Sequence, residues 1–320
     1  MYASYLKRMR TIGSGIGSAV TFLIICAAAG GCHGEHPSSS ASAPSAPAPT
    51  GWRADDEQYR RDLEKKLTSD TGWLTIAGLA FMTEPDTTVG SDPSNDVVLP
   101  AGAPARVGTF QLSADGRVTV RLEPGIKVQL LDGRPFSGGE IKSDGAGPPD
   151  RLVLGDVQVW VHQSGQRLAI RVRDRNSALR KTFTGMKWYP IDPDYRVGAT
   201  FLPYSKPRTF QVPNLLGDID RMTAPGEVRF TLAGKEHRMA AFQDEGELWF
   251  VFRDVTSGET TYPAARFLYT PLPQDGKVVL DFNRAENPPC AFNPYATCPL
   301  PPPQNRLAVR VDAGERYQKH

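Results

Sequence analysis

Nine polar side chains combine charge and hydrogen-bonding capacity with positions that suit a ligand site. They lie at the ends of expected strands or in loops: Arg196, Asp254, Tyr262, Arg266, Asp281, Asn283, Asn287, Asn305 and Glu315. If these loops converge, the two arginines and the neighbouring oxygens form a polar pocket that suits an anionic or polyhydroxylated ligand. The same asparagines and aspartates could instead cap turns and satisfy backbone amides, and both interpretations remain open.

Three functions are compatible with these residues. The first is a binding module that holds a small polar ligand or a partner protein of the cell envelope. The second is a hydrolase in which Asp281 or Asp254 acts as general base while Arg266 or Arg196 stabilises charge. The third is a purely structural envelope protein. The chain contains no G-x-S-x-G, P-loop or H-E-x-x-H motif, which favours the binding module. No cofactor or metal is expected.

Two cysteines outside the leader region, Cys290 and Cys298, lie close together in the sequence. In an exported protein such a pair most simply forms a disulfide. A zinc site is disfavoured because it needs shorter cysteine spacing and more ligands, and the body offers only His162, His237 and His320. Thiol catalysis is the third interpretation, and it lacks a histidine or carboxylate nearby in the sequence.

These cysteines belong to a proline-rich loop that extends from Asp281 to Glu315. Proline fixes φ and removes a backbone donor, so the loop is neither helix nor central strand. The segment before it, GKVVLDF at 276–282, is predicted to be a strand. The segment after it, RLAVRV at 306–311, alternates charged and apolar residues and is predicted to be a returning strand. A rigid loop between two strands is a common place for a site.

A hairpin would bring the loop close to one of the arginines. Arg266 belongs to the strand-like string TYPAARFL, and the segment from Val278 to Phe282 is its expected neighbour. Because side chains alternate along a strand, Asp281 and Asn283 point to one face and Phe282 to the other. We therefore predict that Arg266, Asp281 and Asn283 line one pocket.

The N-terminus is predicted to be a lipoprotein signal. Lys7, Arg8 and Arg10 precede an uncharged apolar run at 19–29, and small residues lead directly to Cys32. Cleavage before Cys32 would leave this residue lipidated, and the protein would be anchored to a membrane of the cell envelope, facing the periplasm or the cell surface. An ordinary cleaved signal and a retained anchor are the alternatives. A Ser-, Ala- and Pro-rich stretch follows and is expected to be a flexible tether.

Composition excludes one class of function. The chain has 320 residues, 40% of them hydrophobic, and a formal net charge of +2, so a nucleic-acid-binding surface is not expected. Its 30 glycines and 28 prolines favour many turns and short strands over long helices.

The fold is predicted to be mainly β, with two packed antiparallel units resembling sandwiches or barrels and one N-terminal amphipathic helix. The helix is predicted at 54–69, where Tyr59, Leu63 and Leu67 recur at helical spacing. The stretch KTFTGMKWYP at 181–190 is predicted to be a strand. The expected organisation is a signal peptide at 1–31, a tether at 32–51, a helix and β-sandwich at 52–147, and a second β unit with the cysteine loop at 148–320.

The first β unit also resembles a degenerate forkhead-associated sandwich. The strings Val89-Gly90-Ser91 and NDVVLP at 95–100 have the order of that fold. Ser91 stands where a phosphate-binding arginine is expected, and ARVG at 105–108 replaces the Ser-Arg-x-His loop. The resemblance therefore supports a sandwich and argues against phosphopeptide binding.

Seven strings together resemble a bacterial family known as domain of unknown function 1684. They are GWL at 72–74, VGSDPSNDVVLP at 89–100, RVRD at 171–174, YPIDPDYRV at 189–197, FRDVTSGETTY at 252–262, ARFL at 265–268 and the loop at 281–315. The resemblance extends over about residues 52–316. It implies no particular reaction.

Overall fold

The computed structural model describes residues 50–145 and 147–317. The predicted signal peptide, the lipidation site Cys32 and nearly all of the tether lie outside these ranges. Within them the protein is mainly β, as predicted, with antiparallel sheets and an N-terminal helix. No helix of the described part is long and apolar enough to cross a membrane.

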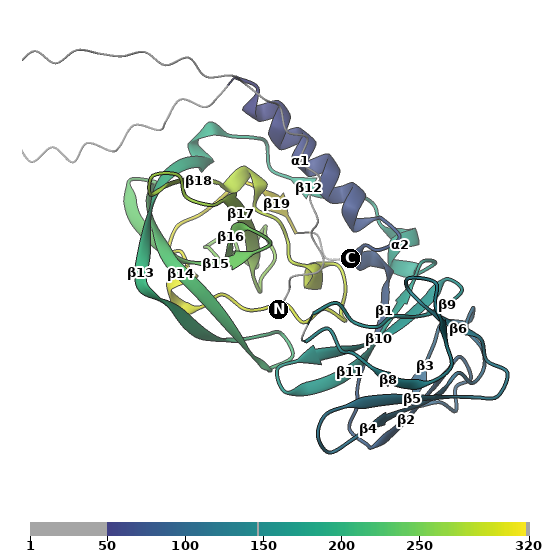
Figure 1. Ribbon diagram of the computed structural model, residues 1–320. Helices are drawn as coiled ribbons and strands as arrows, with labels where there is room; N and C mark the ends of the chain where they lie inside the picture. Colours follow the sequence, from purple (N-terminus) through teal and green to yellow (C-terminus); the bar gives the residue numbers. More distant parts are fainter. Residues whose placement is uncertain (1–49, 146, 318–320) are drawn as a thin grey trace, which may run out of the picture.

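The N-terminal β unit consists of two sheets (Figure 1). One contains, in spatial order, β1 (Ile76–Phe81), β11 (Arg167–Asp174), β10 (Val157–Ser164), β9 (Leu152–Leu154), β6 (Val128–Leu130) and β7 (Pro135–Phe136). The other contains β3 (Val97–Val98), β2 (Asp86–Gly90), β4 (Gly108–Leu112), β5 (Val118–Leu122) and β8 (Gly139–Ile141). Buried residues of both sheets, among them Phe110 and Ile170, form one hydrophobic core.

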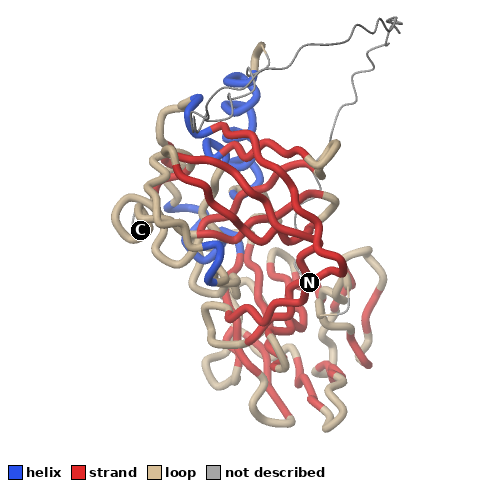
Figure 2. The backbone as a smooth tube through the Cα atoms, turned by 90° about the vertical axis from the view of Figure 1, so that its left-hand side faces the viewer, coloured by secondary structure: helices blue, strands red, loops and turns tan. Residues whose placement is uncertain are grey.

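The C-terminal β unit is a nearly closed barrel. Its strand order is β17 (Arg266–Pro271), β16 (Glu247–Phe252), β15 (Lys235–Asp244), β14 (Ile219–Leu232), β13 (Arg196–Pro213) and β18 (Lys277–Asp281). The two end strands approach each other, and Thr270 Oγ1 donates to the carbonyl of Val279 at 2.7 Å. Figure 2 shows the long strands of this unit above those of the N-terminal unit. The predicted hairpin of β17 and β18 does not form: β18 pairs with β13, and β17 and β18 are the two end strands of the sheet.

The helix α1 (Trp52–Leu67) begins two residues before the predicted start and lies along the outside of the barrel (Figure 1). Its predicted stripe faces the body, where Leu67 is buried and the Tyr59 hydroxyl donates to Glu286 at 2.5 Å. Asp56 is also buried and pairs with Arg284 at 2.6 Å. The hydrophobic pattern of the sequence did not predict that the carboxylate of Asp56 helps to attach the helix to the body.

Two predicted strands are wrong. The segment 181–190 instead contains the end of helix α2 (Ala178–Thr182) and the short β12 (Lys187–Trp188), which pairs with β19 (Glu315–Arg316). Ser177 caps α2 by accepting a hydrogen bond from the amide of Arg180, which starts a helix where alternation indicated a strand.

The segment 306–311 makes only one isolated parallel bridge, between Arg253 and Arg306. The amide of Val311 donates to the Asp254 carboxylate. In a regular strand this amide would donate to the backbone carbonyl of a neighbouring strand.

The N-terminal β unit also extends further along the chain than the predicted boundary near residue 148. Strands β9, β10 and β11 join the first sheet of the N-terminal unit, so this position lies inside that unit. His162 of β10 then links the unit to the cysteine loop. Its Nδ1 lies 2.7 Å from Asp144 Oδ2, and its Nε2 lies 3.2 Å from Thr297 Oγ1.

Candidate functional site

Arg266 and Asp254 form a buried ion pair in which neither side chain is exposed, with 2.9 Å between Nη1 and Oδ2. Arg266 also donates to the carbonyls of Val311 and Ala313. Asp254 accepts from the amide and hydroxyl of Thr256 at 2.8 and 2.7 Å. Arg266 Nε is buried and has no hydrogen-bond partner in the described part of the chain. The bonds of Arg266 to the carbonyls of Val311 and Ala313 anchor the C-terminal segment to the barrel.

Asp281 and Asn283 lie together, as predicted, but in a network separate from that of Arg266. Asp281 Oδ2 lies 3.3 Å from Arg196 Nε, and Asp281 Oδ1 accepts from the side-chain amide of Asn283 at 2.9 Å. Asn283 also bonds to both backbone groups of Asp192. Burial and the neighbouring charge of Asp56 raise the pKa of Asp281.

Asn305 fills a gap between two barrel strands. Its side chain accepts from the amide of Ala240 at 2.7 Å and donates to the carbonyls of Ala240 and Val251 at 3.0 and 2.9 Å. Pairing between β15 and β16 is confined to the end near Phe242, so this amide takes the place of a missing backbone partner. Its contacts are structural.

Tyr262 and the two cysteines hold the other end of the loop. The Tyr262 hydroxyl donates to the carbonyl of Cys290 at 3.0 Å. Burial raises the pKa of this phenol. The amide of Cys290 lies 3.3 Å from the Cys298 sulfur, and no disulfide joins Cys290 to Cys298 in this structure. The predicted disulfide therefore stays a prediction.

Asn287 and Glu315 meet beside the barrel. The amide of Asn287 donates to Glu315 Oε2 at 2.8 Å, and the Asn287 side chain donates to the carbonyl of Arg316 at 3.2 Å. Asn287 Oδ1 is buried and has no hydrogen-bond partner in the described part of the chain. Burial and the nearby charge of Glu286 raise the pKa of the fully buried Glu315 well above its ordinary value.

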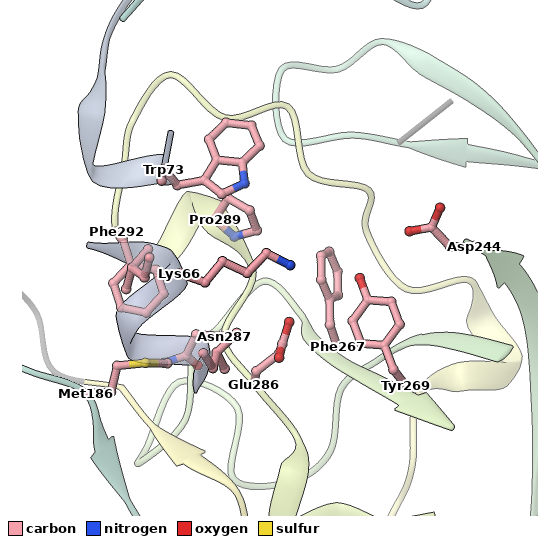
Figure 3. Close-up of a pocket in the computed structure, with 13 residues that line it drawn as sticks. Lys66, Trp73, Met186, Asp244, Phe267, Tyr269, Glu286, Asn287, Pro289 and Phe292 are labelled. Atoms are coloured by element: carbon pink, nitrogen blue, oxygen red, sulfur yellow. The ribbon is translucent and has the colours of Figure 1, made fainter. Parts of the chain in front are cut away.

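A cavity of about 670 Å³, part of it open to solvent, lies between α1, β17 and the proline-rich loop; we call it the Glu286 pocket (Figure 3). Most of its walls are apolar or aromatic: Leu63, Leu67, Trp73, Met186, Phe267, Tyr269, Pro289 and Phe292. Its polar lining residues are Lys66, Asp244, Glu286 and Asn287. An apolar cavity with a few polar groups is typical of a small-molecule site.

Lys66 and Glu286 share one part of the pocket, and Asp244 lies apart from them (Figure 3). The Lys66 ammonium and the Glu286 carboxylate are turned toward the same space, in front of Phe267 and Tyr269 (Figure 3). Glu286 is 7% exposed, and Tyr59 orients its carboxylate. Burial and the like charge of Glu245 raise the pKa of Asp244, and Lys66 opposes this shift. The pocket can therefore bind an apolar body and orient a polar end.

The sequence predicted one residue of this pocket, Asn287. Glu286 and Lys66 were missed, although Leu63 and Leu67 already indicated the helix face that carries Lys66 inward. The missing information was the packing of α1 against the start of the proline-rich loop, since Glu286 and Lys66 are far apart in sequence. Among residues 50–145 and 147–317, no group of three or more His, Cys, Asp or Glu side chains is placed to hold a metal ion.

Comparisons with known proteins give a family and no activity. A solution NMR structure of an uncharacterised protein of Haloarcula marismortui is 34% identical in sequence. The match covers 43% of this chain and 78% of that chain, with a TM-score of 0.37. No curated protein matches the chain. The model of the family described as protein of unknown function, DUF1684, matches residues 181–316, a shorter range than the motifs indicated. Over these residues, the chain belongs to the DUF1684 family.

Proposed function

We propose that the protein binds a small amphipathic molecule in the Glu286 pocket. The observation that carries this proposal is an apolar cavity in which a buried carboxylate and an ammonium group face the same space (Figure 3). The apolar part of the ligand packs against Trp73, Phe267 and Tyr269. Its polar end meets Glu286 and Lys66.

The apolar walls change the expected ligand. The sequence predicted a small polar or anionic ligand, whereas most side chains lining this cavity are apolar. Burial of apolar surface contributes about 25 cal/mol per Å² removed from water, so an apolar body supplies affinity. The few charged groups then select orientation and head-group chemistry. A wholly polar ligand would leave the aromatic walls unused.

The proposal places this pocket in the cell envelope. It rests on the basic, apolar and small residues that precede Cys32, and on the tether that follows. Anchored there by a lipid on Cys32, the protein would meet amphipathic molecules at the membrane surface. Intact-mass analysis of the membrane fraction is expected to show an acylated N-terminal cysteine. A soluble mature chain that begins at another residue would contradict the anchor.

A probe experiment tests the binding function. The anionic aromatic dye 1-anilinonaphthalene-8-sulfonate is expected to bind the folded protein in the Glu286 pocket. Met186→Trp fills the cavity and is expected to weaken dye binding by about tenfold or more, because bulky side chains displace the ligand. The matched control is Leu272→Trp at an exposed site outside the pocket. Equal dye binding by both variants, with unchanged melting temperatures, would refute the proposal.

A hydrolase centred on Asp281 is the second candidate. It is favoured by the raised pKa of this carboxyl and by Arg196 at 3.3 Å, an arrangement that suits a general base beside a charge-stabilising group. Asp254 and Arg266 are poorer candidates because both side chains are fully buried and pair with each other. A panel of nitrophenyl esters tests the idea. Turnover abolished by Asp281→Asn without loss of stability supports it, and turnover equal to that of the wild type refutes it.

A further inference from the structure

A second, smaller cavity adjoins the Glu286 pocket. Its space of about 220 Å³ includes open solvent. Three lining residues, Met186, Asn287 and Phe292, are common to both cavities. The smaller cavity is bordered by β12 and β19, which form a separate two-stranded sheet. A ligand that fills the larger cavity can therefore reach the smaller one with a short head group.

Two cations stand opposite each other beside this cavity. Lys187 and Arg316 are directly paired across β12 and β19, and both line the smaller cavity. Side chains at paired positions lie on the same face, and like charges there destabilise a sheet. Both residues are exposed, and Arg316 lies over the Tyr189 ring. Neither residue forms a salt bridge among residues 50–145 and 147–317. An anion between them would remove the repulsion.

Asn287, which lines both cavities, indicates a second and independent property of the ligand. Asn287 is 6% exposed, and its Oδ1 has no hydrogen-bond partner among residues 50–145 and 147–317. A buried amide oxygen without a donor costs stability, so a ligand N–H or O–H that reaches it gains affinity. Glu315, which also lines this cavity, has a raised pKa and is therefore less able to repel an anion.

We propose that the smaller cavity is the head-group subsite of the same binding site, and that its ligand carries an acidic group together with a hydrogen-bond donor. The donor bonds to Asn287 Oδ1, and the acidic group lies between Lys187 and Arg316. The apolar body occupies the Glu286 pocket, so this inference rests on the proposed function. An acyl chain linked through an amide N–H to a carboxylate has this chemistry.

Three matched probes separate the parts of the inference. N-Octanoylglycine has the apolar chain, the N–H and the carboxylate. Its methyl ester lacks the charge, and N-octanoyl-N-methylglycine lacks the N–H. Calorimetry with wild-type protein at low salt is expected to show the first probe binding about tenfold more tightly than either of the others. The advantage over the ester is expected to shrink as salt screens the cations.

Variants test whether Lys187 and Arg316 recognise the carboxylate of the probe. Lys187→Gln with Arg316→Gln is expected to abolish the preference for the acid over the ester while leaving ester affinity unchanged. The charge-matched control is Lys127→Gln with Arg134→Gln, two exposed residues of the N-terminal unit. Equal binding of acid and ester by the wild-type protein overturns this inference and leaves the proposed function standing. If neither acid nor ester binds, and Met186→Trp has no effect on dye binding, both are overturned.

Discussion

Two polar regions of the C-terminal unit differ in how their charged groups are satisfied. In the network of Arg266 and Asp254, backbone carbonyls, amides and a hydroxyl of the protein itself surround the ion pair. In the Glu286 pocket, charged groups face an apolar cavity, and Asn287 Oδ1 has no partner in the described residues. Arg266 Nε also lacks a partner among the described residues, but its side chain is fully buried, whereas Asn287 lines a cavity. A polar cluster enclosed by the protein stabilises the fold, whereas a polar atom beside a cavity can bind a ligand.

The largest expected effect comes from the closed network. Arg266→Ala leaves the Asp254 carboxylate buried without its counter-charge and is expected to lower the free energy of unfolding by about 3–5 kcal/mol. Urea unfolding measures this change, with Arg306→Ala as an exposed control. At temperatures where the variant stays folded, dye binding in the Glu286 pocket is expected to be unchanged. A variant of normal stability that no longer binds the dye would show that this network is itself a site.

The next effect concerns the cysteines at the far end of the loop. If a disulfide joins Cys290 to Cys298 in the envelope, closing this short loop is expected to contribute about 2–3 kcal/mol. Protein purified from its native compartment should melt at a lower temperature after reduction, and Cys290→Ser should melt at that lower temperature with or without reductant. Two titratable thiols in the native protein would contradict the prediction.

The smallest expected effect is a pH dependence of stability that arises from Glu315, which lies beside Asn287. Burial raises the folded-state pKa of Glu315 above its unfolded value, so the protonated form is favoured in the folded protein. Its contribution to stability is therefore present at low pH and is lost as pH rises through the folded pKa. Glu315→Gln keeps a hydrogen-bond acceptor for Asn287 and removes the charge. The variant is expected to melt a few degrees higher than wild type at pH 9 and about equally at pH 4. A pH-independent difference would contradict this.

The sequence was sufficient for the fold class because alternation and turn residues are local signals. It predicted a mainly β chain and the inward face of α1, where Tyr59 and Leu67 make contacts with the body. It failed where backbone hydrogen bonds go to side chains instead of a neighbouring strand, as at Val311, whose amide bonds to Asp254. Periodicity carries no information about such partners.

The candidate site was harder to predict for a related reason. Residues conspicuous in the sequence, such as Asn283 and Asn305, bond mainly to the backbone of distant segments. Asp281 and Asn283 do lie together, but Arg266 does not join them and pairs with Asp254 instead. The pocket depends on Lys66 and Glu286, which approach only when the helix packs on the barrel. Such long-range packing has no short sequence motif.

The position of Asn305 has a consequence for the order of folding. Its side chain bonds to Ala240, 65 residues earlier, and supplies a donor and an acceptor as a peptide group would. Strands β15 and β16 therefore complete their hydrogen bonding only after this distant asparagine has been synthesised. A nascent chain that ends before residue 305 has all the strands of the barrel and still lacks the group that bridges two of them. The barrel is thus completed only after the segment that carries Asn305 has been synthesised and has packed against it.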